Sequence, residues 1–379
     1  MTPRGAPLPP HAELAAPDTA APTQGRGASG ARIAAINVFR GFAILEVVLH
    51  HTSGIALRLA SEGSFTHTFL AILNRTLHFA VPAFLFMTAV VLTRSALREF
   101  RLGKYYWGRV RKSLVPYVLW TAIYAVFKVL TGANPPEVLL NPERWIFWLQ
   151  YGKAYFHLYF LLIALQFYLV LPLLLPLFRR TWPLWLVVTV AFGTQLGVYW
   201  LNRSTDLVHF RFPGTMALWY IPAITLGMYV GANYARFDEL WRRHRRPVFA
   251  FAALGWAVYL PLAYTVLTGG RVNTFVYSAA HWVYTTVFAL VLFGVAHSAA
   301  RGPAWLSRPL ARLGTFSLQI YLLHPAVLFW VDRRGAFPGG DSALFLLTVL
   351  GYALVALLVP FVIARALEGR RASVWLFGR

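Results

Sequence analysis

The segment 37–51 combines the apolar character of a membrane-spanning helix with four side chains that can take part in acid–base chemistry. It reads NVFRGFAILEVVLHH, and its polar members are Arg40, Glu46, His50 and His51. A charged side chain at the centre of a bilayer costs roughly 2.5–3.5 kcal/mol on insertion scales, and such residues face a bundle interior or a water-filled cavity. We therefore expect this segment to contribute to a polar site inside a helix bundle.

Two of these residues share one face of the helix. Arg40 and His51 are separated by about three helical turns, or roughly 16 Å along the axis. Because histidine suits proton abstraction near neutral pH, we interpret His51 as a general base and Arg40 as the cation that attracts or orients an anion. In the alternative interpretation, Arg40 extends to the lipid headgroups and the histidines cap the outer end of the helix.

Glu46 and His50 are neighbours on an adjacent face of the same helix, four residues apart. Glu46 is the only carboxylate that falls inside any expected span. We expect it to act as a partner of His50 or of a nearby cation rather than as a catalyst.

Two later segments carry further histidines. KAYFHLYFLLIALQFYLVLPLL (153–174) begins a span with His157, a position that is also typical of an ordinary interfacial residue. LGTFSLQIYLLHPAVLFW (313–330) places His324 in mid-span, with Tyr321 on the same helical face. We predict that His157, Tyr321 and His324 support the site, although His324 is also suited to bonding a neighbouring helix.

A basic cluster precedes the third expected span in RLGKYYWGRVRKSLVPYVLW (101–120). Its cations Arg109, Arg111 and Lys112 lie close to three consecutive aromatic residues, YYW (105–107). A positively charged anchor on the cytoplasmic side explains the composition. The functional interpretation is an anion site for phosphates, such as those of a nucleotide-containing cofactor.

Composition places the chain among polytopic membrane proteins. Of its 379 residues, 58% are hydrophobic and only 13% are charged, whereas soluble domains carry about 25% charged residues. The absence of cysteine excludes disulfides, thiolate nucleophiles and cysteine-based metal sites. We attribute the net charge of +22 to cytoplasmic loops rather than to nucleic-acid binding.

Hydropathy predicts an all-α polytopic membrane protein with about ten transmembrane helices. A helix needs about 20 apolar residues to cross the bilayer. The stretches that qualify are 35–57, 76–94, 114–131, 157–176, 184–201, 216–234, 248–267, 279–299, 313–331 and 343–364.

Most of the 35 lysines and arginines fall on one side if the N-terminus is inside. This bias predicts that both termini are cytoplasmic. We divide the chain into a disordered cytoplasmic tail at 1–32, a transmembrane domain at 33–364 and a short basic cytoplasmic tail at 365–379. The sequence contains no nucleotide-binding glycine pattern, and its histidines are not spaced as ligands on one helix, so we predict no metal site.

Several of these segments together resemble the membrane acyltransferase-3 family. The family's opening motif has Arg-Gly and a histidine separated from the Arg by ten intervening residues, and here these are Arg40, Gly41 and His51. FAVPAFLFMTA (79–89), RVRKSLVPY (109–117), HLYFL (157–161) and LGTFSLQIYLLHP (313–325) are similar to its later motifs. The resemblance covers roughly 33–364.

The resemblance implies an O-acyltransferase in the cell membrane. Members of the family move an acyl group, most often acetyl, from cytoplasmic acyl-CoA to a hydroxyl of a carbohydrate, glycolipid or other cell-envelope acceptor. Acyl-CoA would be a co-substrate rather than a permanently bound cofactor. By this resemblance His51 is the base, Arg40 holds the donor, and Arg109, Arg111 and Lys112 bind CoA phosphates. The alternative function is a transporter or exporter of a lipid-linked sugar or acylated polysaccharide.

Overall fold

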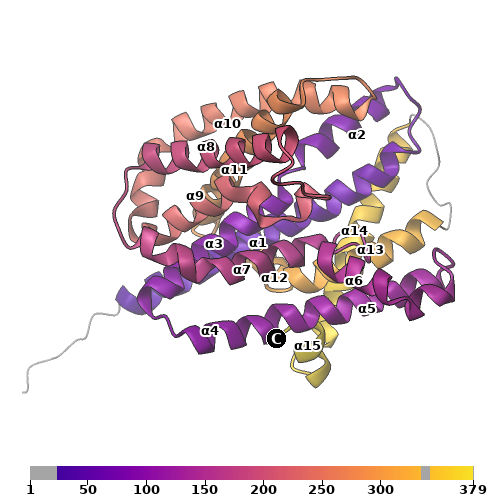
Figure 1. Ribbon diagram of the computed structural model, residues 1–379, viewed down its shortest axis with the longest axis horizontal. Helices are drawn as coiled ribbons and strands as arrows, with labels where there is room; N and C mark the ends of the chain where they lie inside the picture. Colours follow the sequence, from indigo (N-terminus) through magenta and orange to yellow (C-terminus); the bar gives the residue numbers. More distant parts are fainter. Residues whose placement is uncertain (1–23, 334–341, 379) are drawn as a thin grey trace, which may run out of the picture.

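The protein is a bundle of helices, as Figure 1 shows for the computed structural model. The structure describes residues 24–333 and 342–378, with side chains from residue 34 onward. No strand occurs among these residues. Helices satisfy their backbone hydrogen bonds internally, which hydrocarbon surroundings require of a spanning segment. The predicted all-α polytopic class is therefore confirmed.

The first half of the chain contains eight α-helices. They are α1 (Gln24–Leu57), α2 (Phe65–Thr76), α3 (Ala80–Arg98), α4 (Leu102–Arg109), α5 (Val115–Leu130), α6 (Pro142–Tyr151), α7 (Tyr159–Phe178) and α8 (Leu184–Ser204). The second half contains α9 (Ile221–Ala232), α10 (Phe237–Leu267), α11 (Thr274–Ala299), α12 (Ala304–Thr315), α13 (Ser317–Arg333), α14 (Ala343–Ala366) and α15 (Arg371–Phe377). A π-helical turn, η1 (Val110–Leu114), joins α4 to α5, and short 3-10 turns lie at Pro136–Leu140, Pro213–Thr215, Ala217–Tyr220 and Tyr234–Arg236.

Eight helical segments of the described chain are long and apolar enough to cross a membrane. The two other predicted spans have different shapes. The predicted span at 313–331 contains the junction of α12 and α13, which meet at a bend of 74°. The span predicted at 216–234 contains α9, an α-helix of only 12 residues that follows a 3-10 turn.

The ends of the chain also differ from a simple tail–domain–tail division. Helix α1 begins at Gln24, inside the segment that we predicted as a disordered tail, while 1–23 lie outside the described residues. The predicted C-terminal tail contains the short helix α15. The cytoplasmic location of both termini remains a prediction, because the fold itself does not orient the bundle.

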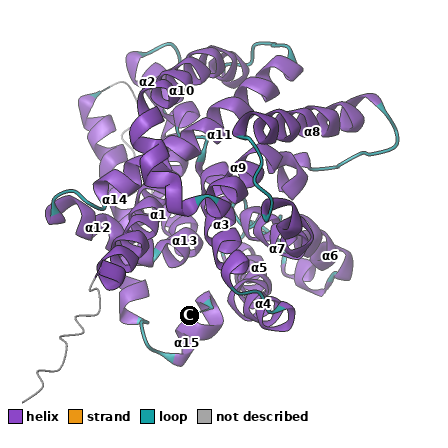
Figure 2. Ribbon diagram, turned by 90° about the vertical axis from the view of Figure 1, so that its left-hand side faces the viewer, coloured by secondary structure: helices purple, strands orange, loops and turns teal. Residues whose placement is uncertain are grey.

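Helices α1, α3 and α11 lie in the middle of the bundle, where Figure 2 shows other helices around them. About half of each membrane-length segment that contains them is buried, against 17% for the segment containing α10. Close contact between α1 and α12 depends on two glycines. A Cβ atom on Gly41 would lie 2.1 Å from the Leu310 carbonyl oxygen, and one on Gly314 would lie 1.7 Å from that of Asn37. Small residues allow this approach of two helix backbones.

A second close contact joins α9 to α3. Gly227 and Gly231 are one helical turn apart in the sequence GMYVG, a GxxxG pattern. A Cβ atom on Gly227 would lie 2.4 Å from the Phe86 carbonyl oxygen, and one on Gly231 would lie 2.6 Å from that of Val90. The short helix α9 is therefore held against α3 by close backbone contact, in addition to the packing of Ile224 and Met228 in one core cluster with Leu85.

We predict that Gly231→Ile destabilises the protein by about 1–3 kcal/mol, because the new side chain would overlap the α3 backbone. The measurement is thermal unfolding of the purified protein in detergent. Gly197→Ile is the matched control, since nothing lies within 4 Å of a Cβ atom at that helical glycine. Equal unfolding temperatures for the two variants would contradict the role given to the α3–α9 contact.

Candidate functional site

His51 lies in the last two turns of α1 and packs against two other rings. The ring of Phe156, from the turn before α7, is 4.8 Å away, measured between ring centroids, and is tilted by 59°. His324 of α13 stacks on His51 at 5.4 Å with an interplanar angle of 24°. These ring contacts restrict the orientation of the imidazole, which is a requirement for positioned proton transfer.

His51 is one member of a continuous row of six imidazoles. His157 lies 6.0 Å from His324, His324 lies 5.4 Å from His51, and His51 lies 5.1 Å from His50. The row continues from His50 to His78 at 5.4 Å and from His78 to His281 at 5.3 Å. These rings come from α1, α11, α13 and the segments just before α3 and α7. We call this arrangement the histidine row.

Backbone carbonyls fix the proton position in two members of the row. The Nδ1 atom of His50 donates to the Asn74 carbonyl oxygen at 3.0 Å, and that of His324 donates to the Ile320 carbonyl oxygen at 3.1 Å. A neutral imidazole that donates from Nδ1 keeps a lone pair on Nε2. The Nε2 atom of His324 is buried and has no hydrogen-bond partner among the described residues.

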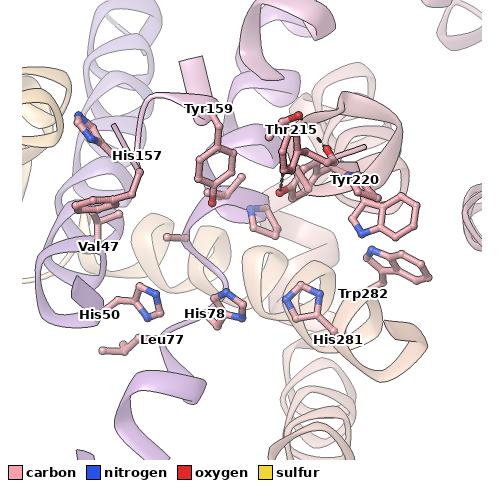
Figure 3. Close-up of a pocket in the computed structure, with 18 of the residues that line it drawn as sticks. Val47, His50, Leu77, His78, His157, Tyr159, Thr215, Tyr220, His281 and Trp282 are labelled. Atoms are coloured by element: carbon pink, nitrogen blue, oxygen red, sulfur yellow. Dashed lines mark hydrogen bonds between the residues drawn. The ribbon is translucent and has the colours of Figure 1, made fainter. Parts of the chain in front are cut away.

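The histidine row borders a cavity of about 600 Å³, which we call the histidine cavity. Figure 3 shows His50, His78 and His281 side by side, with Tyr159 and Tyr220 across the cavity from them. Tyr321 also reaches the cavity, and its hydroxyl donates to the backbone carbonyl of His157. The Tyr321 bond links α13 to the turn that carries Phe156 and His157, and so connects the supports of His51.

Four of the predicted site residues line this cavity together: His50, His51, His157 and Tyr321. His324 lies behind His51 and is fully buried, so it contacts the site through ring stacking. The structure thus brings together residues that are up to 274 positions apart in the sequence. His50 and His51 both line this cavity. The alternative interpretation, in which they only cap the outer end of α1, does not account for that position.

The predicted pair between Glu46 and His50 is not formed, because His50 is bonded to Asn74 instead. Glu46 is 5% exposed, and neither of its carboxylate oxygens has a hydrogen-bond partner among the described residues. The backbone amide of Ala80, at the start of α3, interacts with its carboxyl group. A carboxyl group at a helix N-terminus interacts favourably with the helix dipole. Glu46 therefore faces the α2–α3 break that positions His78.

The predicted cations lie away from the histidine cavity. Arg40 is half-buried and does not line it, and neither do Arg109, Arg111 and Lys112. Arg40 precedes Gly41, at the close contact between α1 and α12. The side chains on the shared face of α1 thus belong to two regions of the bundle, with Arg40 next to the α1–α12 contact and His51 at the histidine cavity.

The predicted basic cluster lies in a continuous helical segment formed by α4, η1 and α5. The Arg109 guanidinium lies 5.3 Å from the Tyr168 ring and 5.6 Å from the Tyr105 ring, which ties it to α7. Arg111 and Lys112 are exposed and lie in the π-helical turn η1. Turns of this kind occur frequently at functional sites. Arg111 and Lys112 are thus exposed cations of the α4–η1–α5 segment, and the ring contacts that hold Arg109 do not include them.

The C-terminal helix α15 packs beside this turn. Phe377 is 1% exposed and its ring lies 5.9 Å from Trp120, whose indole N–H donates to the Leu376 carbonyl oxygen at 2.7 Å. The backbone of Gly378 contacts that of Lys112, since a Cβ atom there would be 2.5 Å from the Lys112 Cα atom. The segment predicted as a basic tail is therefore a packed part of the bundle.

A second cavity of about 300 Å³ lies between the α12–α13 bend and the residues around α15. Its lining includes Gln319, Arg370 and Arg371. Gln319 is 3% exposed, and its side-chain oxygen has no hydrogen-bond partner in the described structure. Gln319 is only five residues before His324, so α13 connects this cavity to the histidine row over about 7.5 Å.

Sequence reasoning missed four basic residues of the histidine cavity: His78, His281, Lys153 and Arg211. His281 was detectable, because it lies inside the predicted span 279–299 and a histidine in a span indicates an interior polar position. His78 was detectable for the same reason, as the third residue of the predicted span 76–94. Lys153 and Arg211 carry no such signal, because they belong to connecting segments whose proximity only the fold establishes.

The arrangement can support proton transfer. Neutral imidazoles with accessible ring nitrogens accept protons near neutral pH. Among the described residues, no group of three histidine, aspartate or glutamate side chains is arranged to hold a metal ion. The absence of a metal from the reaction remains a prediction.

A model described as an acyltransferase domain matches residues 33–365 of the chain. The chain belongs to the acyltransferase-3 family. The match includes α1, α3, α5, α7 and α13, which carry the sequence motifs described above. Arg40, Gly41 and His51, which resemble the family's opening motif, lie inside the matched range.

Two relatives illustrate the range of functions given to similar proteins. The chain is 22% identical over 258 residues to a protein of Staphylococcus aureus named "Probable poly-beta-1,6-N-acetyl-D-glucosamine export protein", covering 66% of this chain and 69% of that protein. It is 23% identical over 310 residues to a protein of Bacillus subtilis named "Putative membrane-bound acyltransferase YfiQ", covering 77% and 80%. No solved structure is significantly similar to it.

We predict that Asn74→Leu destabilises the protein by about 1–3 kcal/mol, because a buried amide that bridges α1 and α2 is lost. The Asn74 side chain donates to the His50 carbonyl oxygen at 2.8 Å and to the Ser53 hydroxyl at 3.2 Å. Thermal unfolding in detergent measures the effect. An unchanged unfolding temperature would show that the α1–α2 contact does not depend on this side chain.

Proposed function

We propose that this protein is an integral membrane O-acyltransferase that moves an acyl group, most simply acetyl, from acyl-CoA to a hydroxyl of a carbohydrate or cell-envelope acceptor. The observation that carries the proposal is the position of His51. His51 lines a cavity of about 600 Å³ and packs against the rings of Phe156 and His324. A cavity inside a helix bundle that is lined by several imidazoles is a setting in which acid–base chemistry at this residue can take place.

In the proposed reaction His51 removes the proton of the acceptor hydroxyl. The hydroxyl oxygen attacks the thioester carbonyl, a C–O bond forms, and the C–S bond of the thioester breaks. The proton passes from the imidazolium to the departing CoA thiolate, so that protons and charges balance. Histidine is suited to both transfers because its ordinary pKa lies near neutral pH.

The donor would approach from the basic region of the bundle. Arg111 and Lys112 are exposed in the π-helical turn and are suited to the phosphates of CoA. Arg109 is engaged with the Tyr105 and Tyr168 rings, so we assign it to shaping this turn rather than to direct phosphate contact. Arg40 lies about 16 Å from His51 along α1, so the extended arm of an acyl-CoA would have to cover this distance.

Export of a sugar polymer is the second candidate function, and the name of the Staphylococcus aureus relative favours it. The histidine cavity would then be part of a substrate conduit rather than a reaction site. The two proposals differ in one requirement, because an exporter needs no acyl-CoA.

We predict that His51→Gln lowers acyl transfer from radiolabelled acetyl-CoA by about 10²–10⁴-fold, the range for loss of a general base. The measurement uses purified protein in lipid with a mixture of membrane glycans as acceptors. His209→Gln is the matched control, since that histidine is exposed and does not line the cavity. Turnover that is unaffected by His51→Gln would remove the proposed base, and absence of any acetyl-CoA turnover would favour the exporter.

We predict that the double substitution Arg111→Gln/Lys112→Gln raises the KM for acetyl-CoA about tenfold and leaves kcat within about twofold, because charge-assisted contacts to phosphate are lost. Arg179→Gln/Arg180→Gln removes two exposed charges after α7 and serves as the control. An unchanged KM in the first variant would place the donor elsewhere, with the second cavity and its Arg370 and Arg371 as the next position to test.

A further inference from the structure

The histidine cavity has an uneven distribution of charge. Two cations, Lys153 and Arg211, belong to its lining, and no carboxylate does among the described lining residues. Lys153 lies in the turn between α6 and α7, and Arg211 lies in the segment between α8 and α9. Both side chains are exposed. Two connecting segments from different parts of the chain therefore bring positive charge to the same cavity.

One aromatic ring holds both cations. The Lys153 ammonium lies 4.7 Å from the centroid of the Phe212 ring, and the Arg211 guanidinium lies 5.5 Å from the same centroid. Arg211 also lies 5.3 Å from the Phe147 ring. Cation–π contacts of this kind reduce the freedom of the long side chains and leave their N–H groups able to donate to another molecule.

Neither cation forms an ion pair with a carboxylate of the described chain. Two like charges that share one ring repel each other, and this repulsion is relieved by an anion placed between them. A third cation adds to the field, because Arg75 lies beside His50, His78 and His281. The potential in the cavity is therefore positive, which favours a negatively charged molecule.

The remaining wall is aromatic. Trp219 and Trp282 line the cavity with their ring centroids 5.4 Å apart, and Tyr220 lies next to them. Figure 3 shows Tyr220 and Trp282 at the end of the cavity near His281. Apolar and aromatic walls with a few placed charges are typical of sites for small organic ligands.

We propose that the acceptor of this protein is an anionic saccharide, and that Lys153 and Arg211 bind its carboxylate or phosphate group. This inference rests on the proposed acyl transfer to a carbohydrate hydroxyl. The anionic group would lie between the two cations, a sugar ring would pack against the aromatic wall, and a hydroxyl would face His51. Lys153 and Arg211 would then decide which acceptors are bound rather than take part in acyl transfer.

The test is direct binding without any acyl donor, in nanodiscs of phosphatidylcholine. The probes are trigalacturonic acid and its fully methyl-esterified form, which is the uncharged match. We expect the acid to bind at least about tenfold more tightly than the ester, and Lys153→Gln/Arg211→Gln to abolish this preference. Arg203→Gln is the matched control, because Arg203 is an exposed arginine 5.9 Å from the Tyr199 ring and does not line the cavity.

Competition by small sugars and a change of lipid identify the anion that is bound. Competition by glucuronate but not glucose 6-phosphate would support a carboxylate, and the reverse would support a phosphate. Equal binding of the acid and the ester by the wild-type protein would overturn the inference. Loss of the preference when phosphatidylglycerol replaces part of the phosphatidylcholine would also overturn it, because the cations would then bind lipid headgroups. Because no donor is present, these results are independent of whether His51 supports acyl transfer.

Discussion

The burial of α1 by other helices is the constraint on which the rest of this structure depends. Arginine, glutamate and histidine side chains are costly in hydrocarbon, so the helix that carries them must be enclosed. Glycines at 41 and 314 permit backbone contact between α1 and α12, and α3 and α11 complete the enclosure (Figure 2). The packed helices exclude lipid from the surroundings of His51, and the histidine cavity lies beside this residue. Both the proposed chemistry and its location follow from this enclosure.

The bundle separates two kinds of polar region. Imidazoles and aromatic rings surround the histidine cavity, whereas the predicted phosphate-binding cations lie on the α4–α5 segment, away from it (Figures 1 and 3). Helix α13 joins the histidine cavity to the second cavity, since Tyr321 lines the first and Gln319 lines the second. Such a division suits a reaction whose donor and acceptor reach His51 from different sides of the bundle.

Membership of the family says less about the substrate of this protein than the side chains that line its cavity do. Relatives at 22–23% identity bear names as different as an exporter and an acyltransferase. The cations that we propose to distinguish acceptors lie in connecting segments, the Lys153 turn and the Arg211 segment. These segments evolve under fewer packing constraints than the helices do, and binding residues are often found there. Substrate choice is therefore best sought in the lining of the cavity.

Sequence alone determined the all-α membrane class and the placement of the long spans, because hydropathy and helical periodicity are local properties. It also proposed Arg40 and His51 as site residues. It also selected His157, Tyr321 and His324, although it gave no reason for their proximity to His51. Tertiary structure decided which residues share a site. It separated Arg40 from the cavity, replaced the Glu46–His50 pair by a bond to Asn74, and added His78, His281, Lys153 and Arg211. It also introduced the 74° bend after α12, which hydropathy does not detect because it describes composition along the chain and not direction. The physical reason is that contacts between distant segments depend on how helices pack, and periodicity within one helix specifies only the face that it buries.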